Sequence, residues 1–229
     1  MRLRPSNELP SRGATPTPQR SLRDSVRRNR QLRGLVQLAG YLVRRRNCVV
    51  WEADLTVPRA PTTWAPGERA LEIGPENLDA VMTPTLLAFL GGDRMRQSLE
   101  DIRRGNRLLV VVDDDGYAAY GHIVVNSAGY MRVLGEREPV PHLGNFFTAP
   151  RARRRGLFKG VLNESQRVLQ RLGYGRALLE TRPTNAASMK GSERMGMRIT
   201  RHLRGWIVFD SLVIQRDIHN RGRWQAVRR

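Results

Sequence analysis

The chain has 229 residues, of which 40% are hydrophobic, so it can bury one sizeable core, alone or with a small accessory element. Its 40 basic residues against 21 acidic ones give a formal net charge of +19, and such a surface attracts phosphates, acidic proteins, anionic membranes and nucleic acid. A single cysteine excludes an internal disulfide and a cysteine-rich metal site, and no apolar run reaches the roughly 18–20 residues of a membrane span. The basic N-terminus lacks the apolar segment of a secretory signal, so we expect a cytoplasmic protein.

The first 67 residues are predicted to precede the main domain. Residues 1–20 hold four prolines and scattered arginines, which is typical of a disordered basic tail. In the extension 21–67, apolar residues at helical spacing predict one helix, and residues 47–55 predict a strand with Cys48 as a small buried hydrophobe. The helix can pack its apolar face on the main domain, or it can lie on an anionic membrane or nucleic acid. Three prolines then separate the extension from a domain at 68–215.

The first half of that domain is predicted to contain strand 69–73, helices 75–90 and 93–105, and strands 107–112 and 117–126. The last two strands are joined by Asp113-Asp114-Asp115-Gly116, a hairpin signal. Consecutive aspartates suggest a metal site, but no further ligand spacing supports one, so we expect a solvated turn.

The second half is predicted to contain strand 142–148, a helix from Gly156 to Gly173, strand 176–181, helix 185–195, and strands 199–209 and 212–214. The tail 216–229 is basic, and we expect it to be frayed. This order of elements predicts an α/β (α+β) fold on a mixed sheet rather than a doubly wound one.

An arginine-rich loop joins strand 142–148 to the helix that begins at Gly156. A helix N-terminus presents unpaired backbone N–H groups and a partial positive charge, and a glycine lets an anion approach the backbone closely. Arg153, Arg154 and Arg155 add positive charge, so a pyrophosphate fits this loop. The alternative is an arginine run that forms only a solvated face.

The loop resembles the Q/R-x-x-G-x-G/A signature of the GNAT N-acyltransferase superfamily, with Arg153 and Gly156 in the first and fourth places. Phe158 stands where the family has a small residue. A second resemblance lies downstream, where a strand leads to Asn185 and then to a helix followed by Gly196-Met197. The family often has a tyrosine seven residues after this asparagine, but this chain has Ser192 there.

The resemblance implies a mostly antiparallel sheet flanked by helices, and it implies acetyl-CoA or another acyl-CoA as the cofactor. In the family the pantetheine arm enters between two separating parallel strands, and here the backbone of strand 142–148 would bind it. The cofactor-binding residues that the resemblance implies are Phe146, Phe147, Thr148, Arg153, Arg154, Arg155, Gly156, Leu157, Phe158, Lys159, Asn185 and Ser188.

Acyl transfer to an amine needs a group that takes a proton from the nitrogen. His142, at the start of its strand, is the first candidate base, and His122 on the preceding strand is the second. Tyr120 alternates with His122 and shares its sheet face, which makes it a candidate acid. The alternative, which a histidine on a strand favours, is a partly exposed residue without a chemical role.

The resemblance implies direct transfer of an acyl group, in the simplest case acetyl, to a small-molecule or protein amine. The basic surface suits an acidic acceptor or an acyl carrier protein as donor. The alternative is a catalytically weak or inactive GNAT-like module that binds nucleic acid, an anionic membrane or an acidic protein through its arginines. Phe158 and Ser192 are the residues that favour this alternative.

Overall fold

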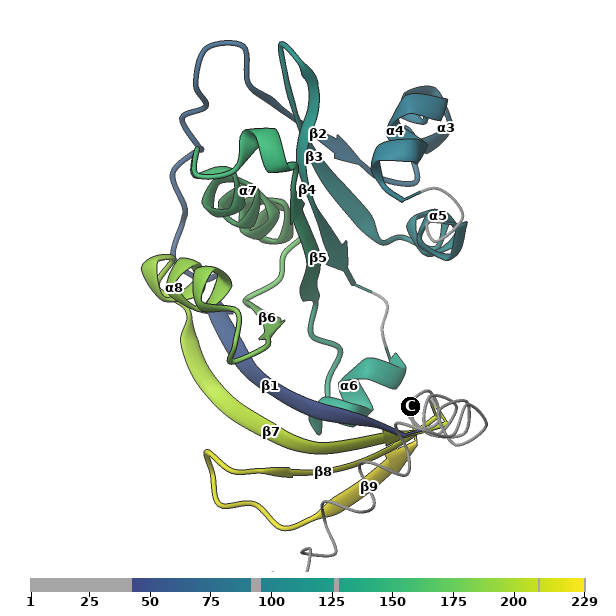
Figure 1. Ribbon diagram of the computed structural model, residues 1–229, viewed down its shortest axis with the longest axis vertical. Helices are drawn as coiled ribbons and strands as arrows, with labels where there is room; N and C mark the ends of the chain where they lie inside the picture. The colour runs from purple at the N-terminus through teal and green to yellow at the C-terminus, as the bar shows by residue number, and fades with distance from the viewer. Residues whose placement is uncertain (1–42, 92–95, 126–127, 210, 229) are drawn as a thin grey trace, which may run out of the picture. The chain divides into compact units, whose positions relative to one another are not determined.

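The computed structural model describes residues 43–91, 96–125, 128–209 and 211–228, and those from Arg44 onward belong to one compact unit. One sheet runs through them in the order β2-β3-β4-β5-β6-β1-β7-β8-β9 (Figure 1). The strands are β1 (Val43–Asp54), β2 (Arg69–Ile73), β3 (Arg107–Asp113), β4 (Gly116–Val124), β5 (His142–Thr148), β6 (Arg176–Thr181), β7 (Arg198–Val208), β8 (Leu212–Asp217) and β9 (Gln225–Arg228). The helices are α3 (Leu78–Val81), α4 (Pro84–Phe89), α5 (Arg96–Arg103), α6 (Ala128–Leu134), α7 (Leu157–Arg171) and α8 (Ala186–Arg194).

Neighbouring strands whose pairing is described are antiparallel, except β5 and β6, which are parallel. This arrangement confirms the predicted mixed, mostly antiparallel sheet flanked by helices. None of the helices in the described ranges has both the length and the apolar character that a membrane crossing requires.

Strand β3 is covered on both faces, because its buried residues alternate between two clusters. Leu108 and Val110 pack with residues of α3, α4 and α5. Leu109 and Val111 pack with residues of α7, including Val161. Since successive side chains of a strand point to opposite faces, the sheet has here an α7 face and an α5 face, named after these covering helices.

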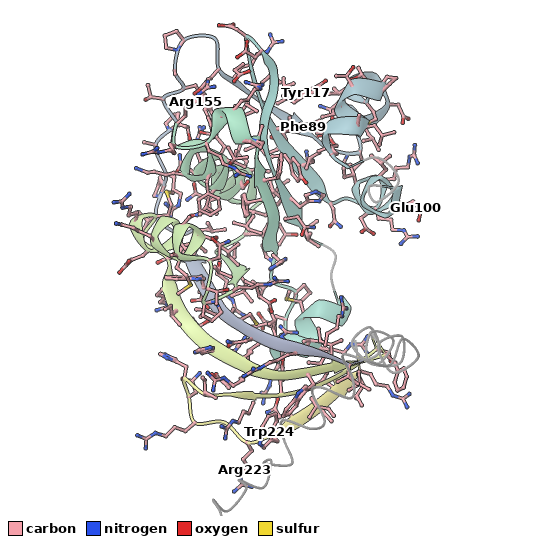
Figure 2. The ribbon with its side chains drawn as sticks, in the orientation of Figure 1. Phe89, Glu100, Tyr117, Arg155, Arg223 and Trp224 are labelled. Carbon is pink, nitrogen blue, oxygen red and sulfur yellow. The ribbon has the colours of Figure 1, made fainter. Side chains whose placement is uncertain are left out.

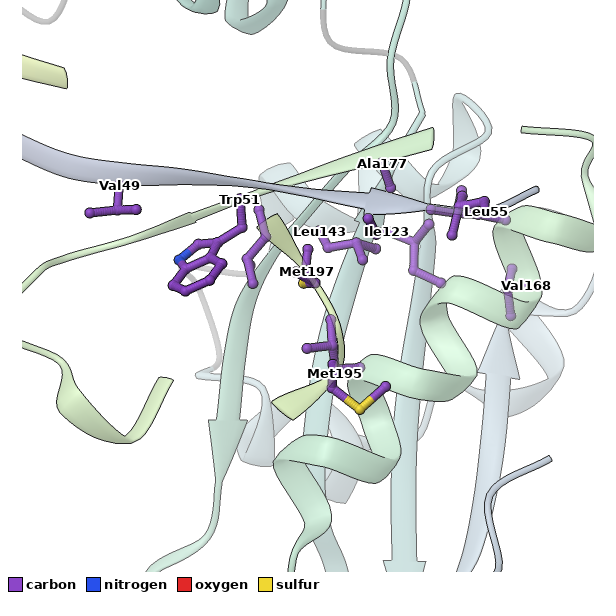
Figure 3. Close-up of a cluster of buried hydrophobic side chains, with 13 residues drawn as sticks. Val49, Trp51, Leu55, Ile123, Leu143, Val168, Ala177, Met195 and Met197 are labelled. Carbon is purple, nitrogen blue, oxygen red and sulfur yellow. The ribbon is translucent and has the colours of Figure 1, made fainter. Parts of the chain in front are cut away.

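Strand β1 lies inside the sheet, between β6 and β7. Val49 pairs with Thr181 of β6, and Trp51 joins the main core with Met195 (Figure 3). The strand that the sequence assigned to an extension at 21–67 is therefore part of the sheet of the main domain. The predicted tail 1–20 and the predicted helix before this strand lie outside the described residues.

The proline-containing segment 57–64 lies along the outer side of α7. The backbone N–H of Thr62 donates to the Glu164 carboxylate at 2.6 Å, and the Asn163 amide donates to the carbonyl of Ala60 at 2.9 Å. The prolines exclude helix and ladder pairing here, as predicted, and side chains of α7 supply partners for the exposed backbone instead.

The helix predicted at 75–90 is two short helices. Pro84 stands in the first turn of α4, and the Thr83 hydroxyl caps this helix by accepting from the Leu86 N–H at 3.1 Å. A proline disrupts a helix interior but suits a first turn, so the chain starts a new helix at this point. Helix α5 covers 96–103 of the predicted 93–105, and residues 92–95 lie outside the described ranges.

Helix α6 and strand β9 were not predicted. Strand β9 pairs with β8 through Val213 and Val227, so the C-terminal tail carries an edge strand rather than a frayed end. Three of its four residues are exposed, which leaves no alternation of apolar and polar residues for a sequence pattern to detect.

Candidate active site

Strands β5 and β6 run side by side only at their starts. His142 pairs with Leu178 and Leu143 pairs with Leu179, although both strands continue beyond these pairs. Beyond Leu143 the two strands share no further ladder pair, so backbone groups on their facing edges are available to a ligand. The GNAT resemblance implied such a separation.

One extra residue in β5 redirects its side chains. Between its pairs with Tyr120 and His122 of β4, β5 advances three residues while β4 advances two. Asn145 has a φ of +50°, a left-handed conformation that asparagine tolerates better than most residues. As a result, the side chain of Phe146 lies on the α7 face of the sheet. The side chain of Phe147 lies on the α5 face, where it stacks on Tyr120 with ring centroids 5.5 Å apart.

The arginine loop after β5 enters α7 through two left-handed residues. Arg154 has a φ of +69° and Gly156 a φ of +82°. A Cβ built on Gly156 meets nothing within 4 Å, and residues 153–156 are exposed. The first backbone N–H groups of α7 are therefore open to an anion.

Asp113 braces this loop. Its Oδ2 accepts from Arg151 and from Arg155 at 2.8 Å each, and its Oδ1 accepts from Arg151 at 2.9 Å. Hydrogen bonds from Arg151 and then Arg155 lower the pKa of the Asp113 carboxyl to about 2. The expected solvated turn at 113–116 is thus wrong for Asp113, which is buried and ion-paired. Within the described ranges, no cluster of three or more acidic, histidine or cysteine side chains could hold a metal ion.

Arg155 also donates to the Glu68 carboxylate at 3.1 Å, so its guanidinium is occupied by two carboxylates, those of Asp113 and Glu68. Arg153 and Arg154 are exposed, with the Arg153 Nε donating to the Thr148 carbonyl at 3.4 Å. Lys159 lines a cavity of about 650 Å³ between the start of α7 and segment 57–64, and this cavity reaches Gly156. The start of α7 is therefore accessible from two sides.

Phe158 fills space between α7 and α8. Its ring lies 5.2 Å from that of Phe146 and packs on the backbone of Gly191. This chain thus has a large residue on α7 where GNAT enzymes have a small one, and a glycine on α8 makes room for it. The ring therefore packs toward β5 and α8, while residues 153–156 of the loop remain exposed.

The predicted residues of α8 have structural roles. The Asn185 side chain caps α8 by accepting from the Ser188 N–H at 3.2 Å, which leaves its amide group for a ligand. Ser192 is completely buried, and its hydroxyl has no hydrogen-bond partner in the described part of the chain. Ser192 therefore cannot replace the tyrosine of the family as an acid.

His122, Tyr120 and His142 gather on the α5 face. The rings of Tyr120 and His122 are 5.7 Å apart. Gly144 lies directly opposite His122, and the His142 imidazole lies over Gly144, where a Cβ would be 2.8 Å from its Cε1. Since cross-strand partners share a face, both histidines stand beside the point where β5 leaves β6. Phe89 of α4 borders the group, stacked 5.5 Å from Tyr117 (Figure 2).

Burial lowers the pKa of both histidines. The pKa of His122 falls to about 4, and that of His142 falls to about 3, where the positive charge of Arg46 adds to the effect of burial. Both imidazoles are neutral near pH 7 and can accept a hydrogen bond or a proton. Burial raises the pKa of Tyr120, so its hydroxyl remains protonated.

Arg46 of β1 and Glu180 of β6 form an ion pair next to this face, and no motif in the sequence indicates either residue. Cys48 lies beside them, and burial raises its pKa to about 12, so it is an inert thiol, as expected for a small buried hydrophobe. Arg46 and Cys48 are two residues apart in β1, so their side chains point to the same face of the sheet. This spacing could have indicated the pair, but the prolines after β1 predict that the strand lies outside the domain.

A family model described as Acetyltransferase (GNAT) family matches residues 79–197, which is more than half of the chain. The chain therefore belongs to the GNAT acetyltransferase family. A comparison with curated proteins gave no match.

Among solved structures, the chain is similar to a GCN5-related N-acetyltransferase from Sphaerobacter thermophilus, with 17% identity, a TM-score of 0.45, and coverage of 76% of this chain and 54% of the other. It is also similar to a GCN5-related N-acetyltransferase from Kribbella flavida, with 15% identity, a TM-score of 0.47, and coverage of 74% of this chain and 61% of the other. A third similar structure is an aminoglycoside N-acetyltransferase in complex with CoA, with 18% identity, a TM-score of 0.43, and coverage of 58% of this chain and 92% of the other. The chain thus spans little more than half the length of the first of these proteins.

Proposed function

We propose that this chain transfers an acyl group, most simply acetyl, from acyl-CoA directly to an amine. The observation that carries the proposal is the separation of β5 from β6 directly after Leu143 and Leu179. The separated stretch of β5 runs from Gly144, beside the histidines, to Thr148, which leads into the arginine loop. It spans roughly 13 Å at the usual rise of a strand. An extended pantetheine arm lying along it would reach from the loop to the histidines.

In this proposal the acyl donor is held by groups from three elements. The N–H groups at the start of α7, with Arg153 and Arg154, bind the diphosphate. The backbone of β5 from Phe146 to Thr148 hydrogen-bonds the arm. The oxygen of the Asn185 side chain is used in the cap of α8, and its NH₂ group, which has no partner among the described residues, donates a hydrogen bond to the acyl-CoA.

The chemistry of the proposed reaction needs neither a cysteine nucleophile nor a metal. The amine nitrogen bonds to the thioester carbonyl carbon, the carbon–sulfur bond breaks, and the proton that leaves the nitrogen ends on the thiol. Neutral His142, or His122 beside it, accepts the hydrogen bond of the amine and then its proton, which becomes acidic once the nitrogen has attacked. Protonated Tyr120 is the hydrogen-bond donor and acid on the same face.

The acceptor is proposed to be a small-molecule or protein amine. The net charge of +19 suits an acceptor with negative charge, or an acyl carrier protein as a donor with an acidic surface. We also propose a cytoplasmic reaction.

A second candidate function is polyanion binding by a catalytically weak module, and one observation favours it. Trp206 and Trp224 stack with ring centroids 5.2 Å apart, and they are 44% and 49% exposed. The Arg216 guanidinium lies 5.3 Å from the Trp224 ring, at the edge strand where Figure 2 labels this tryptophan. Exposed aromatic rings flanked by arginine are suited to stacking with bases of single-stranded nucleic acid.

Release of free thiol from acetyl-CoA in the presence of a panel of amines tests the first proposal. The wild type is expected to release thiol with at least one amine, and Gly156→Asp is expected to lose this activity, because its carboxylate repels the diphosphate. Gly173→Asp is the control, because Gly173 ends α7 with a φ of +83° and similar open space. No release with any amine, together with salt-sensitive retention on DNA, would favour the second candidate.

A further inference from the structure

A second cavity lies at the carboxyl end of β6, beside the part of β6 that has separated from β5. Its volume is about 540 Å³. It is open to solvent and is lined by the start of β1, the end of β6 with the residue after it, and one residue of β7. Its polar lining includes Arg45, Arg46, Glu180, Thr181 and Arg182.

The side chains that line the cavity carry more positive than negative charge. Arg46 is paired with Glu180. Arg45 and Arg182 are exposed side chains on its rim, and neither forms an ion pair with any described residue. Three guanidinium groups and one carboxylate leave a formal charge of +2 in the lining.

Thr181 adds an unused hydrogen-bonding group. Its side chain is 4% exposed, and its Oγ1 has no hydrogen-bond partner in the described part of the chain. Burying a hydroxyl without a partner is unfavourable, and native structures rarely do so unless a ligand or water completes the bond. The lining of the cavity therefore includes a residue whose hydrogen-bonding group the described part of the chain leaves unsatisfied.

Arg46 links this cavity to the proposed catalytic face. It lines the cavity, and its positive charge acts on the His142 imidazole. Glu180 and Thr181 belong to the separated end of β6, and Arg182 follows directly, so the cavity adjoins the reacting end of the proposed donor site. The diphosphate of the donor belongs to the start of α7, where separate cations are available to it.

We infer that this cavity binds an anionic group, a carboxylate or a phosphate, on the amine acceptor. Arg45 and Arg182 are its counter-ions, and the Thr181 hydroxyl donates to it. A guanidinium is suited to this task because it donates two parallel hydrogen bonds to carboxylate or phosphate oxygens. The inference rests on the proposed function and deepens it, since it names the acceptor class as amines that carry a negative charge.

Matched acceptor pairs test the inference during turnover. Each pair contains an anionic amine and its neutral counterpart: an amino acid and its carboxamide, and an amino-sugar phosphate and the free amino sugar. The wild type is expected to favour the anionic members by about tenfold or more in kcat/KM, the size of one charged hydrogen bond. Arg182→Gln and Thr181→Val should reduce this preference and leave the KM for acetyl-CoA unchanged. Which pair shows the larger preference distinguishes carboxylate from phosphate.

Arg194→Gln is the control, because Arg194 is an exposed arginine in the last turn of α8 and outside the cavity. Equal use of anionic and neutral acceptors by the wild type would overturn the inference, as would equal effects of Arg182→Gln and Arg194→Gln.

Direct binding separates this inference from the proposed function. Inorganic phosphate is titrated calorimetrically with saturating CoA present, so that the diphosphate site at α7 is filled. Weaker phosphate binding in Arg182→Gln than in Arg194→Gln supports the cavity even if no amine is acylated. Phosphate binding that is the same in both variants and the wild type refutes it, whether or not thiol release is observed.

Discussion

The phenyl ring of Phe158 and the backbone of Gly191 are complementary: a Cβ on Gly191 would lie 2.5 Å from Cε1 of the ring. A real Cβ contact is almost never so short, so any larger residue at this position would force the ring of Phe158 to shift. The large residue on α7 and the missing side chain on α8 therefore form one packing unit. It explains how this chain tolerates an aromatic residue at a place where GNAT enzymes have a small one.

The first prediction concerns this unit. Gly191→Ala usually stabilises a helix interior by up to about 1 kcal/mol. Here it should destabilise the protein, by roughly 1–3 kcal/mol, because the added methyl group overpacks against the ring. Chemical denaturation of the single variant measures the effect.

The same change in a Phe158→Leu background is the control, since a shorter side chain leaves room for the methyl group. The cost of Gly191→Ala should fall or change sign there, and the difference is the coupling between the two positions. An equal cost in both backgrounds would show that the contact is not responsible.

The second prediction concerns the brace at Asp113. Asp113→Asn removes the charge that holds Arg151 and Arg155, so the loop before α7 should loosen and CoA should bind more weakly. Asp114→Asn, in the same turn but exposed, should have little effect on either stability or CoA affinity. CoA titration of both variants tests this, and equal affinities would contradict the role of the brace.

The third prediction concerns stability in acid. The pKa of His122 is about 4 in the folded protein and about 6.5 when unfolded, so the unfolded chain binds the proton first as the pH falls. The stability from keeping this histidine neutral is complete above pH 6.5 and is lost progressively toward pH 4. The loss is on the order of 3 kcal/mol at most.

Urea unfolding between pH 7 and pH 4 measures this loss. His122→Gln should reduce the slope of the curve over that window by about half, because His142, with a pKa of about 3, still contributes a similar slope. His219→Gln, at an exposed histidine, should leave the shape of the curve unchanged. Identical curves for the wild type and His122→Gln would mean that the buried imidazole does not control the acid response.

The fourth prediction concerns the pH dependence of catalysis. Because the pKa values of His122 and His142 lie at about 4 and 3, kcat/KM should show no inflection near pH 6.5. It should instead rise with the deprotonation of the amine acceptor. An inflection near 6.5 that disappears in His142→Gln would contradict the neutral state assigned to that imidazole.

The sequence predicts well those parts of the fold whose signal is local. Strands β2, β5 and β6 have the predicted bounds, because each is a short apolar run between turn residues. The arginine loop and the start of α7 follow from Gly156 and from the change to helical spacing after it. The family follows from the motif in this loop, and the match to residues 79–197 confirms it.

The sequence could not predict what depends on pairing between distant segments. The prolines after β1 predicted a domain boundary, but the pairing of Val49 with Thr181 places this strand in the sheet. Asp113 appeared to belong to a turn, and only the fold brings Arg151 and Arg155 to it. The face shared by His122 and His142 depends on the extra residue in β5 near Asn145, which no spacing reveals.

The proposed function requires the backbone at the start of α7 to bind the diphosphate of the donor. Calorimetric titration of CoA into the wild type, Gly156→Asp and Gly156→Asn tests it directly, because both substituents tolerate a left-handed φ and differ only in charge. We predict that Gly156→Asp binds CoA at least about tenfold more weakly than Gly156→Asn, a difference of about 1.4 kcal/mol. Equal affinities of the two variants for CoA, or no binding by the wild type, would contradict the claim.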